Sequence, residues 1–205
     1  MKKLDEFLKA SAQGDLLPWN AQKQAMKEFG LTCGQVEQAA LTLSILPARY
    51  QRNRKTITTL DQLRLFQSKV AVIGCGGLGG YIIEELARLG VGTIKAIDPD
   101  VFEEHNLNRQ ILCTVSDLGK AKAKVAQKRV KAVNPAITII PVVNPFSQEN
   151  GTELLQDMDT VVDALDSVPT RIELADCCET LKIPMVHGTI GGWYGQVTTQ
   201  LPGDG

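Results

Sequence analysis

The chain has 205 residues, 43% of them apolar and 22% charged, with a net charge of −1. This is the composition of a soluble globular protein, and its balanced charge argues against a nucleic-acid binder or a protein held on an anionic membrane. No apolar run reaches the roughly 18 residues of a membrane span, and the first residues lack the apolar segment of a secretory signal. The five cysteines are odd in number and irregularly placed, which argues for a reducing cytoplasm, so we expect a cytoplasmic protein.

Residues 1–47 predict a small N-terminal helical appendage. Apolar residues recur at helical spacing in three stretches, which glycine and proline residues separate. Thr32 could cap the third helix, and Pro47 would end it. A DNA-reading helix-turn-helix over 20–46 is an alternative, but these helices carry too few lysines and arginines to hold phosphate groups.

Residues 48–68 predict a connector, which begins with the basic stretch ARYQRNRK and ends in a short lead-in helix. From residue 69 to 205 short apolar runs alternate with helical patterns. We expect strands at 70–73, 93–97, 137–143, 160–164 and 184–187, helices at 79–89, 119–133, 149–156 and 169–181, and an antiparallel edge strand at 194–201. This alternation predicts an α/β fold, a Rossmann-like doubly wound, mostly parallel sheet with helices on both faces.

A glycine loop follows the first of these strands and opens a helix. The GxGxxG pattern runs from Gly74 to Gly79, and this strand–loop–helix context gives it meaning. Gly74 allows a tight turn, Gly76 lets a phosphate approach the backbone, and Gly79 allows close helix–strand packing. Asp98 ends the next strand, where a carboxylate accepts hydrogen bonds from ribose hydroxyls. A nucleotide site is the favoured interpretation, and a glycine-rich turn without a ligand is the alternative.

The residues downstream favour a triphosphate over a dinucleotide. The segment 98–110 concentrates polar groups beside the ribose position. Arg109 could reach a polyphosphate with its guanidinium fork, and Lys122 begins a helix at the same edge of the sheet. Asp163 and Asp166 flank the end of a strand, where a carboxylate that faces a polyphosphate is a natural magnesium ligand.

Seven sequence pieces together carry a family resemblance: ARYQRN, VAVIGCGGLGG, AIDPD, HNLNRQ, LGKAK, DALDS and VHGTIGGWYGQV. In their order and spacing, the chain resembles the MoeB/ThiF/HesA family, bacterial relatives of the ubiquitin-activating enzymes, from about residue 48 to 204. The resemblance implies an adenylyltransferase that uses ATP and Mg²⁺. Its substrate would be the C-terminal glycine carboxylate of a ubiquitin-like sulfur-carrier protein of the MoaD/ThiS type, and pyrophosphate would leave.

The resemblance also implies which residues form the site. The nucleotide contacts would be Gly74, Gly76, Gly77, Gly79, Asp98, Asp100, Asn106, Asn108, Arg109, Gln110 and Lys122. Arg109, Lys122 and Asp166 would act in catalysis, with Asp166 binding magnesium or orienting the reacting groups. Arg52 would reach the triphosphate of a partner subunit, which implies a homodimer. The alternative for the segment around Arg52 is a solvated linker.

The chemistry of such a reaction suits this set of residues. A carboxylate nucleophile, with a pKa of about 3.5, is already ionised at pH 7 and needs no general base. Catalysis is therefore positioning and charge neutralisation. Three alternatives stay open: an NAD-dependent oxidoreductase, a related adenylating enzyme for a peptide or a tRNA base, and a nucleotide- or carrier-binding protein without turnover.

Two features depart from the family pattern. The five cysteines include no CxxC pair, so we expect no structural zinc and no disulfide framework, and we expect the cysteines to be structural. A downstream cysteine for a thioester or persulfide is also missing, and we expect a fragment of a longer protein. His187 ends a strand near the expected cleft, where a hydrogen-bonded structural role is favoured over substrate contact. Trp193 and Tyr194 could receive the tail of the carrier.

Overall fold

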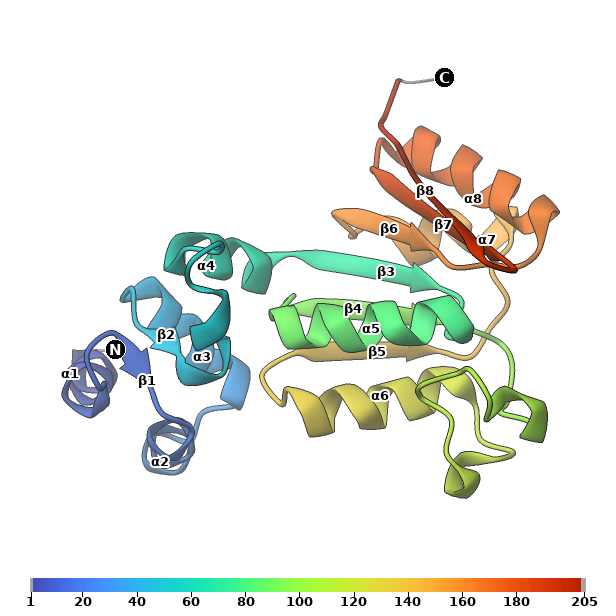
Figure 1. The fold of residues 1–205 in the computed structure, drawn as a ribbon. Coiled ribbons are helices and arrows are strands. Elements are labelled where there is room, and N and C mark those ends of the chain that lie inside the picture. Colours follow the sequence, from blue (N-terminus) through green and yellow to red (C-terminus); the bar gives the residue numbers. More distant parts are fainter. Residues whose placement is uncertain (1, 204–205) are drawn as a thin grey trace.

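A computed structural model describes residues 2–203 and gives eight α-helices and eight strands within them (Figure 1). The helices are α1 (Lys2–Ser11), α2 (Trp19–Phe29), α3 (Cys33–Thr42), α4 (Thr59–Gln67), α5 (Gly77–Leu89), α6 (Lys122–Val133), α7 (Gln148–Leu155) and α8 (Val168–Leu181). The strands are β1 (Leu16–Leu17), β2 (Leu46–Pro47), β3 (Lys69–Ile73), β4 (Thr93–Ile97), β5 (Thr138–Val142), β6 (Thr160–Asp163), β7 (Met185–Gly191) and β8 (Tyr194–Gln200). Short 3₁₀ helices are η1 (Ala48–Asn53), η2 (Glu104–Asn106) and η3 (Val115–Asp117).

A six-stranded sheet forms the centre of the molecule, in the order β5-β4-β3-β6-β7-β8. All neighbours are parallel except β7 and β8, which form an antiparallel hairpin at one edge. The chain leaves β3 for β4 and β5 on one side and then returns to β6 on the other side. The predicted α/β, doubly wound and mostly parallel sheet is therefore confirmed, as is its antiparallel edge strand.

Helices cover both faces of the sheet because its central strands are apolar on both faces. In β3, Val70 and Val72 pack with α5 and α6, whereas Ala71 and Ile73 pack with α7 and α8. Successive side chains of a strand point to opposite faces, so a continuous apolar run fits a strand between two helical layers. Among the described helices, none is both long and apolar enough to cross a membrane.

The N-terminal appendage forms a small helical unit with its own apolar cluster, to which α1, α2 and α3 contribute. It lies beyond the amino ends of the central strands (Figure 1). The side chain of Thr32 accepts from the backbone N–H of Gln35, as expected for a helix cap. Pro47 does not end this helix: α3 stops at Thr42, and Pro47 lies in β2, which pairs with β1.

One predicted helix begins later than expected. The pattern at 119–133 becomes α6, which starts at Lys122. Gly119 has a φ of +78°, in the left-handed region, and Ala121 forms an isolated β-bridge with Val101. This bridge is a long-range contact that helical periodicity does not reveal.

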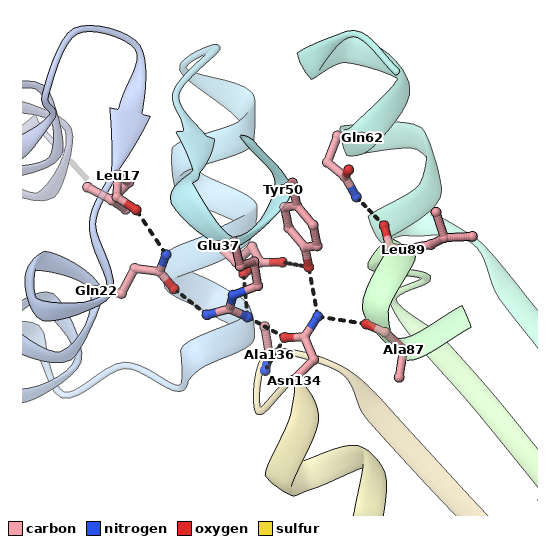
Figure 2. A network of polar contacts seen from close by, with 10 residues as sticks. Leu17, Gln22, Glu37, Tyr50, Gln62, Ala87, Leu89, Asn134 and Ala136 are labelled. Carbon is pink, nitrogen blue, oxygen red and sulfur yellow. Dashed lines mark hydrogen bonds and ion pairs between the residues drawn. The ribbon is translucent and has the colours of Figure 1, made fainter. Parts of the chain in front are cut away.

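A buried polar network joins the appendage to the sheet domain (Figure 2). The hydroxyl of Tyr50 donates to Glu37 Oε1 at 2.7 Å and accepts from Asn134 Nδ2 at 2.7 Å. Asn134 Nδ2 also donates to the carbonyl of Ala87 at 3.0 Å. Glu37 Oε2 makes no hydrogen bond within residues 2–203, and the Arg49 guanidinium, at 3.2 Å, compensates its charge as an ion pair. Burial raises the pKa of Glu37, and Arg49 opposes that rise.

Candidate nucleotide site

A cavity of about 1100 Å³ lies at the carboxyl ends of β3, β4 and β6, where the chain direction across the sheet reverses. Ligands of open α/β sheets bind in the crevice at such a switch point. Nine of the expected site residues line the cavity: Gly74, Gly76, Gly77, Asp98, Asp100, Arg109, Gln110, Lys122 and Asp166. The structure therefore brings together residues that lie up to 92 positions apart, from Gly74 to Asp166.

The glycine loop forms the floor of this cavity. Gly74 has a φ of +96°, and a Cβ atom there would lie 2.6 Å from the carbonyl oxygen of Ala164. A Cβ on Gly79 would lie 1.8 Å from the Gly74 carbonyl oxygen. Helix α5 begins at Gly77 with no side-chain cap at its N-terminus. The first backbone N–H groups of a helix have no intrahelical partner, so this end of α5 suits a phosphate.

Asp98 is buried at the end of β4 and is held by the backbone. Its Oδ2 accepts from the N–H of Cys75 at 2.7 Å, and its Oδ1 accepts from the N–H of Asp100 at 2.8 Å. Burial raises the pKa of Asp98, while these two N–H groups and the Lys122 ammonium oppose that rise. A carboxylate offers about four lone-pair sites, so Asp98 retains acceptor capacity for ribose hydroxyls.

Three polar groups on the other side of the cavity suit a polyphosphate. Lys122, the first residue of α6, is 7% exposed, and its Nζ lies 2.9 Å from Asp100 Oδ2. Arg109 is exposed, and its guanidinium donates to the His105 carbonyl at 3.0 Å. Gln110 is buried, and its Oε1 has no hydrogen-bond partner among the described residues. An unpaired buried amide oxygen costs free energy, which a bound ligand with a donor group would recover.

The two aspartates at the end of β6 differ in position. Asp166 is exposed and lines the cavity. Asp163 is fully buried, and its carboxylate is occupied by the Leu165 N–H and by the His187 ring. The Asp163 carboxylate therefore does not face a ligand in the cavity, whereas Asp166 is open to one.

Four expected site residues do not line the cavity. Gly79 packs α5 against the glycine loop, as its contact with Gly74 indicates. Asn106 is buried, and its Oδ1 accepts from the Glu103 N–H, which caps η2. Asn108 Oδ1 accepts from the Arg109 guanidinium at 3.2 Å. Arg52 is exposed in η1 and does not line the cavity of its own chain.

The cavity also includes residues that sequence reasoning did not single out. Tyr81 on α5, Phe146 before α7, Arg171 on α8 and Thr189 on β7 all line it. Arg171 lies five residues after Asp166, in the first turns of a helix. This closeness in sequence to an expected site residue could have identified Arg171 as a candidate. Thr189 lies within VHGTIGGWYGQV, one of the pieces that carry the family resemblance. The resemblance assigned no role to Thr189 itself.

The residues present fit ATP with magnesium. The glycine cradle leaves no room for Cβ atoms at Gly74 and Gly79, and Lys122 and Arg109 supply positive charge beside it. Within residues 2–203, no group of three or more histidine, cysteine, aspartate or glutamate side chains could hold a metal alone. Magnesium in nucleotide sites is bound by one or two carboxylates together with substrate phosphates and water, and the open carboxylate of Asp166 fits that part.

Comparison with known proteins finds a family model that matches most of this chain. A family model described as the ThiF family matches residues 50–205. The SAMP-activating enzyme E1 of Haloferax volcanii is 43% identical over 141 residues, which cover 69% of this chain and 52% of that protein. The sulfur carrier protein adenylyltransferase of Thermus thermophilus is 41% identical over 136 residues, covering 66% of this chain and 50% of that protein. The chain spans about half the length of these curated relatives.

A solved structure supports the same placement. The crystal structure of the Escherichia coli tRNA N6-threonylcarbamoyladenosine dehydratase TcdA, in complex with ATP, has a TM-score of 0.69 and 31% identity to this chain. The likeness covers 72% of this chain and 61% of that one. The names of these relatives give different substrates.

Proposed function

Because the chain belongs to the ThiF family, we propose that it is an ATP- and Mg²⁺-dependent adenylyltransferase for a ubiquitin-like sulfur-carrier protein. It activates the C-terminal glycine carboxylate of the carrier and releases pyrophosphate. One observation carries the proposal: the cavity joins the glycine loop and Asp98 to Lys122, Arg109 and Asp166 at the switch point of the sheet. The relatives named for SAMP activation and sulfur-carrier adenylylation support this choice of substrate.

Each part of the cavity has a task in this reaction. The N-terminus of α5 holds phosphate oxygens, and Asp98 holds the ribose. Lys122 and Arg109 neutralise the triphosphate, so that the anionic carboxylate of the carrier can approach the α-phosphate. The carboxylate attacks, the acyl–phosphate bond forms, and pyrophosphate leaves with the bonding electrons. Since the nucleophile is already ionised at pH 7, no side chain has to accept a proton.

Lys122 must first leave its ion pair with Asp100, or share its ammonium between Asp100 and the ligand. An ammonium has three donor hydrogens, so one can stay on Asp100 Oδ2, 2.9 Å away, while others bind phosphate. Asp166 would hold Mg²⁺, which when bound offsets phosphate charge. Asp100 is exposed and lines the same cavity, and it positions the Lys122 ammonium.

Arg52 acts in the site of a second copy, and the working form is a homodimer in the cytoplasm. That Arg52 does not line the cavity of its own chain supports this assignment. Mixing two inactive variants, Arg52→Ala and Lys122→Ala, tests it. Random exchange of subunits should restore about one quarter of the wild-type activity, because half of the dimers are mixed and each mixed dimer has one intact site. No recovery, with mixed dimers shown by capture of one untagged variant through a tag on the other, would mean that Arg52 does not act across subunits.

A tRNA base is the second candidate substrate, because a solved structure named as a tRNA dehydratase shares the fold at 31% identity. Activation of a carrier carboxylate and activation of a tRNA base both need ATP bound in the same cavity. The two substrates can be distinguished by the reaction of ATP that each one stimulates. A carrier should drive exchange of pyrophosphate into ATP, whereas tRNA should consume ATP only when it bears the substrate base.

The test of the proposed function is isotope exchange between pyrophosphate and ATP, with ubiquitin-like carriers that end in glycine. Wild-type protein should catalyse exchange only with carrier and Mg²⁺ present. Lys122→Ala should lower the rate by roughly 100-fold or more, the cost of removing one donor to developing charge. Lys128→Ala is the matched control, since Lys128 is exposed on the same helix and does not line the cavity. Equal losses in both variants would contradict the assigned role of Lys122.

A further inference from the structure

In the loop between β6 and α8, side chains hydrogen-bond both the N–H and the carbonyl group of Leu165, the residue before Asp166. The Leu165 N–H donates to Asp163 Oδ1 at 2.9 Å. Its carbonyl oxygen accepts from Arg171 Nε at 2.9 Å and also from a terminal guanidinium nitrogen of Arg171. These contacts fix the peptide groups of Leu165, and with them the point from which the Asp166 side chain leaves the backbone.

His187 completes this arrangement from the next strand. It lies beside Asp163 in the register of β6 and β7, and its Nδ1 is 2.6 Å from Asp163 Oδ2. A carboxylate only accepts hydrogen bonds, so His187 donates from Nδ1. His187 does not line the cavity, in contrast to Leu165, Asp166 and Arg171. It can therefore act on a ligand only through the residues that it contacts.

Arg171 lies between two competing acceptors. Its Nε is 3.7 Å from Asp163 Oδ2, beyond hydrogen-bond distance, while it donates to the Leu165 carbonyl. Asp163 is fully buried, so its charge needs donors on both oxygens. As long as His187 supplies the donor to Oδ2, Arg171 is free to stay on Leu165. Without His187, Asp163 Oδ2 would be a buried charge without a donor, and the nearby donor that could reach it is Arg171, whose Nε lies 3.7 Å away.

We propose that His187 is a positioning residue for Asp166: by satisfying Asp163, it keeps Arg171 on the Leu165 carbonyl and holds the loop in the form that binds magnesium with ATP. The proposal rests on the proposed function in assigning magnesium to Asp166. The hydrogen bonds of Leu165 to Asp163 and Arg171 are contacts within the chain itself and do not depend on that assignment. Loss of His187 should move Arg171 to Asp163 and release the loop.

The first experiment measures amide hydrogen exchange by NMR in the full ligand-free chain. In His187→Ala, the Leu165 N–H should exchange about tenfold faster, the factor expected when one hydrogen bond to a charged group is weakened. The Ala164 N–H is the internal control, because it donates to the Ile73 carbonyl at 2.9 Å and not to the loop. His187→Asn should restore slow exchange, since its amide nitrogen can take the place of Nδ1. Unchanged exchange at Leu165 in His187→Ala would overturn the proposal.

The second experiment measures the Mg²⁺ concentration that half-saturates ATP binding, by calorimetry. His187→Ala should raise it by about 10-fold or more, as lost outer-shell partners do, while affinity for ATP without Mg²⁺ stays the same. Thr198→Ala, opposite His187 on β8 and exposed, is the control for damage to the hairpin and should match the wild type.

A double variant tests whether the effect passes through Arg171. If it does, Arg171→Gln and Arg171→Gln/His187→Ala should have the same magnesium requirement. Additive effects of the two substitutions would refute the coupling. If the wild type bound ATP without any response to Mg²⁺, the proposed function would fail, while the exchange experiment would still decide whether His187 holds the loop.

Discussion

Tyr50→Phe should destabilise the protein by a predictable amount, because it removes one hydroxyl from the buried network and keeps the ring. Tyr50 is 1% exposed, and its hydroxyl serves both Glu37 and Asn134. Loss of the donor to the Glu37 carboxylate costs roughly 1.5–3 kcal/mol, and loss of the acceptor for Asn134 costs roughly 0.5–1.5 kcal/mol. Asn134 keeps its bond to Ala87, which favours the lower end of the second range.

The expected loss is therefore about 2–4 kcal/mol of unfolding free energy. Trp19 gives a local probe, because the Arg49 guanidinium lies 5.2 Å from the centre of its ring, beside the network. The chain has two tryptophans, so urea unfolding followed by fluorescence in a Trp193→Phe background reports on Trp19 alone.

Tyr194→Phe is the matched control, since Tyr194 is 84% exposed. Its effect should stay within about 0.5 kcal/mol. If Tyr50→Phe also changed the unfolding free energy by less than about 0.5 kcal/mol, the network would contribute no net stability, and the reasoning from its hydrogen bonds would be refuted.

Three further predictions concern the glycine loop, an ion-pair cluster and the cysteines. Gly79→Ala should abolish ATP binding and lower the melting temperature, because its Cβ would lie 1.8 Å from the Gly74 carbonyl oxygen. Gly77→Ala should fold normally, since nothing lies within 4 Å of a Cβ atom at that position. Melting curves followed by circular dichroism distinguish the two variants. Hydrogen bonds from Arg129 and Arg88 lower the pKa of Glu84, so the stability that its charge contributes is present above the unfolded pKa of about 4.3 and is lost as pH falls through the lower folded value. Glu84→Gln should thus be less stable at pH 7, and urea titrations should show the difference shrinking as pH falls below about 4.3. Burial raises the pKa of all five cysteine thiols, so a thiol reagent at pH 8 should label them only after denaturation; rapid labelling of the native protein would contradict their burial.

The central sheet and much of the cavity were predictable because local patterns encode them. The continuous apolar run of β3 requires a strand between two helical layers, and the glycines that follow require a tight turn into a helix. Asp98 and Lys122 lie at the carboxyl edge simply because one ends a strand and the other begins a helix. Parallel strands place all such positions at one edge of the sheet.

Other features depend on contacts that sequence spacing does not contain. Helical periodicity alone does not tell which residue of α8 turns toward the cavity, so Arg171 was not singled out. The pairing of Asp163 with His187 follows from the register of two strands, and the bond from Asn134 to Tyr50 joins residues 84 positions apart. The late start of α6 likewise results from the bridge between Val101 and Ala121.

Calorimetric titration of ATP with Mg²⁺, and separately of NAD, tests most directly whether the glycine-loop cavity is a triphosphate site. The wild type should bind ATP in a magnesium-dependent manner and bind NAD much more weakly. Lys122→Ala should weaken ATP binding, Asp166→Ala should change its magnesium dependence, and Lys128→Ala should do neither. Tight binding of NAD, with ATP binding absent or indifferent to Lys122 and Asp166, would contradict the account.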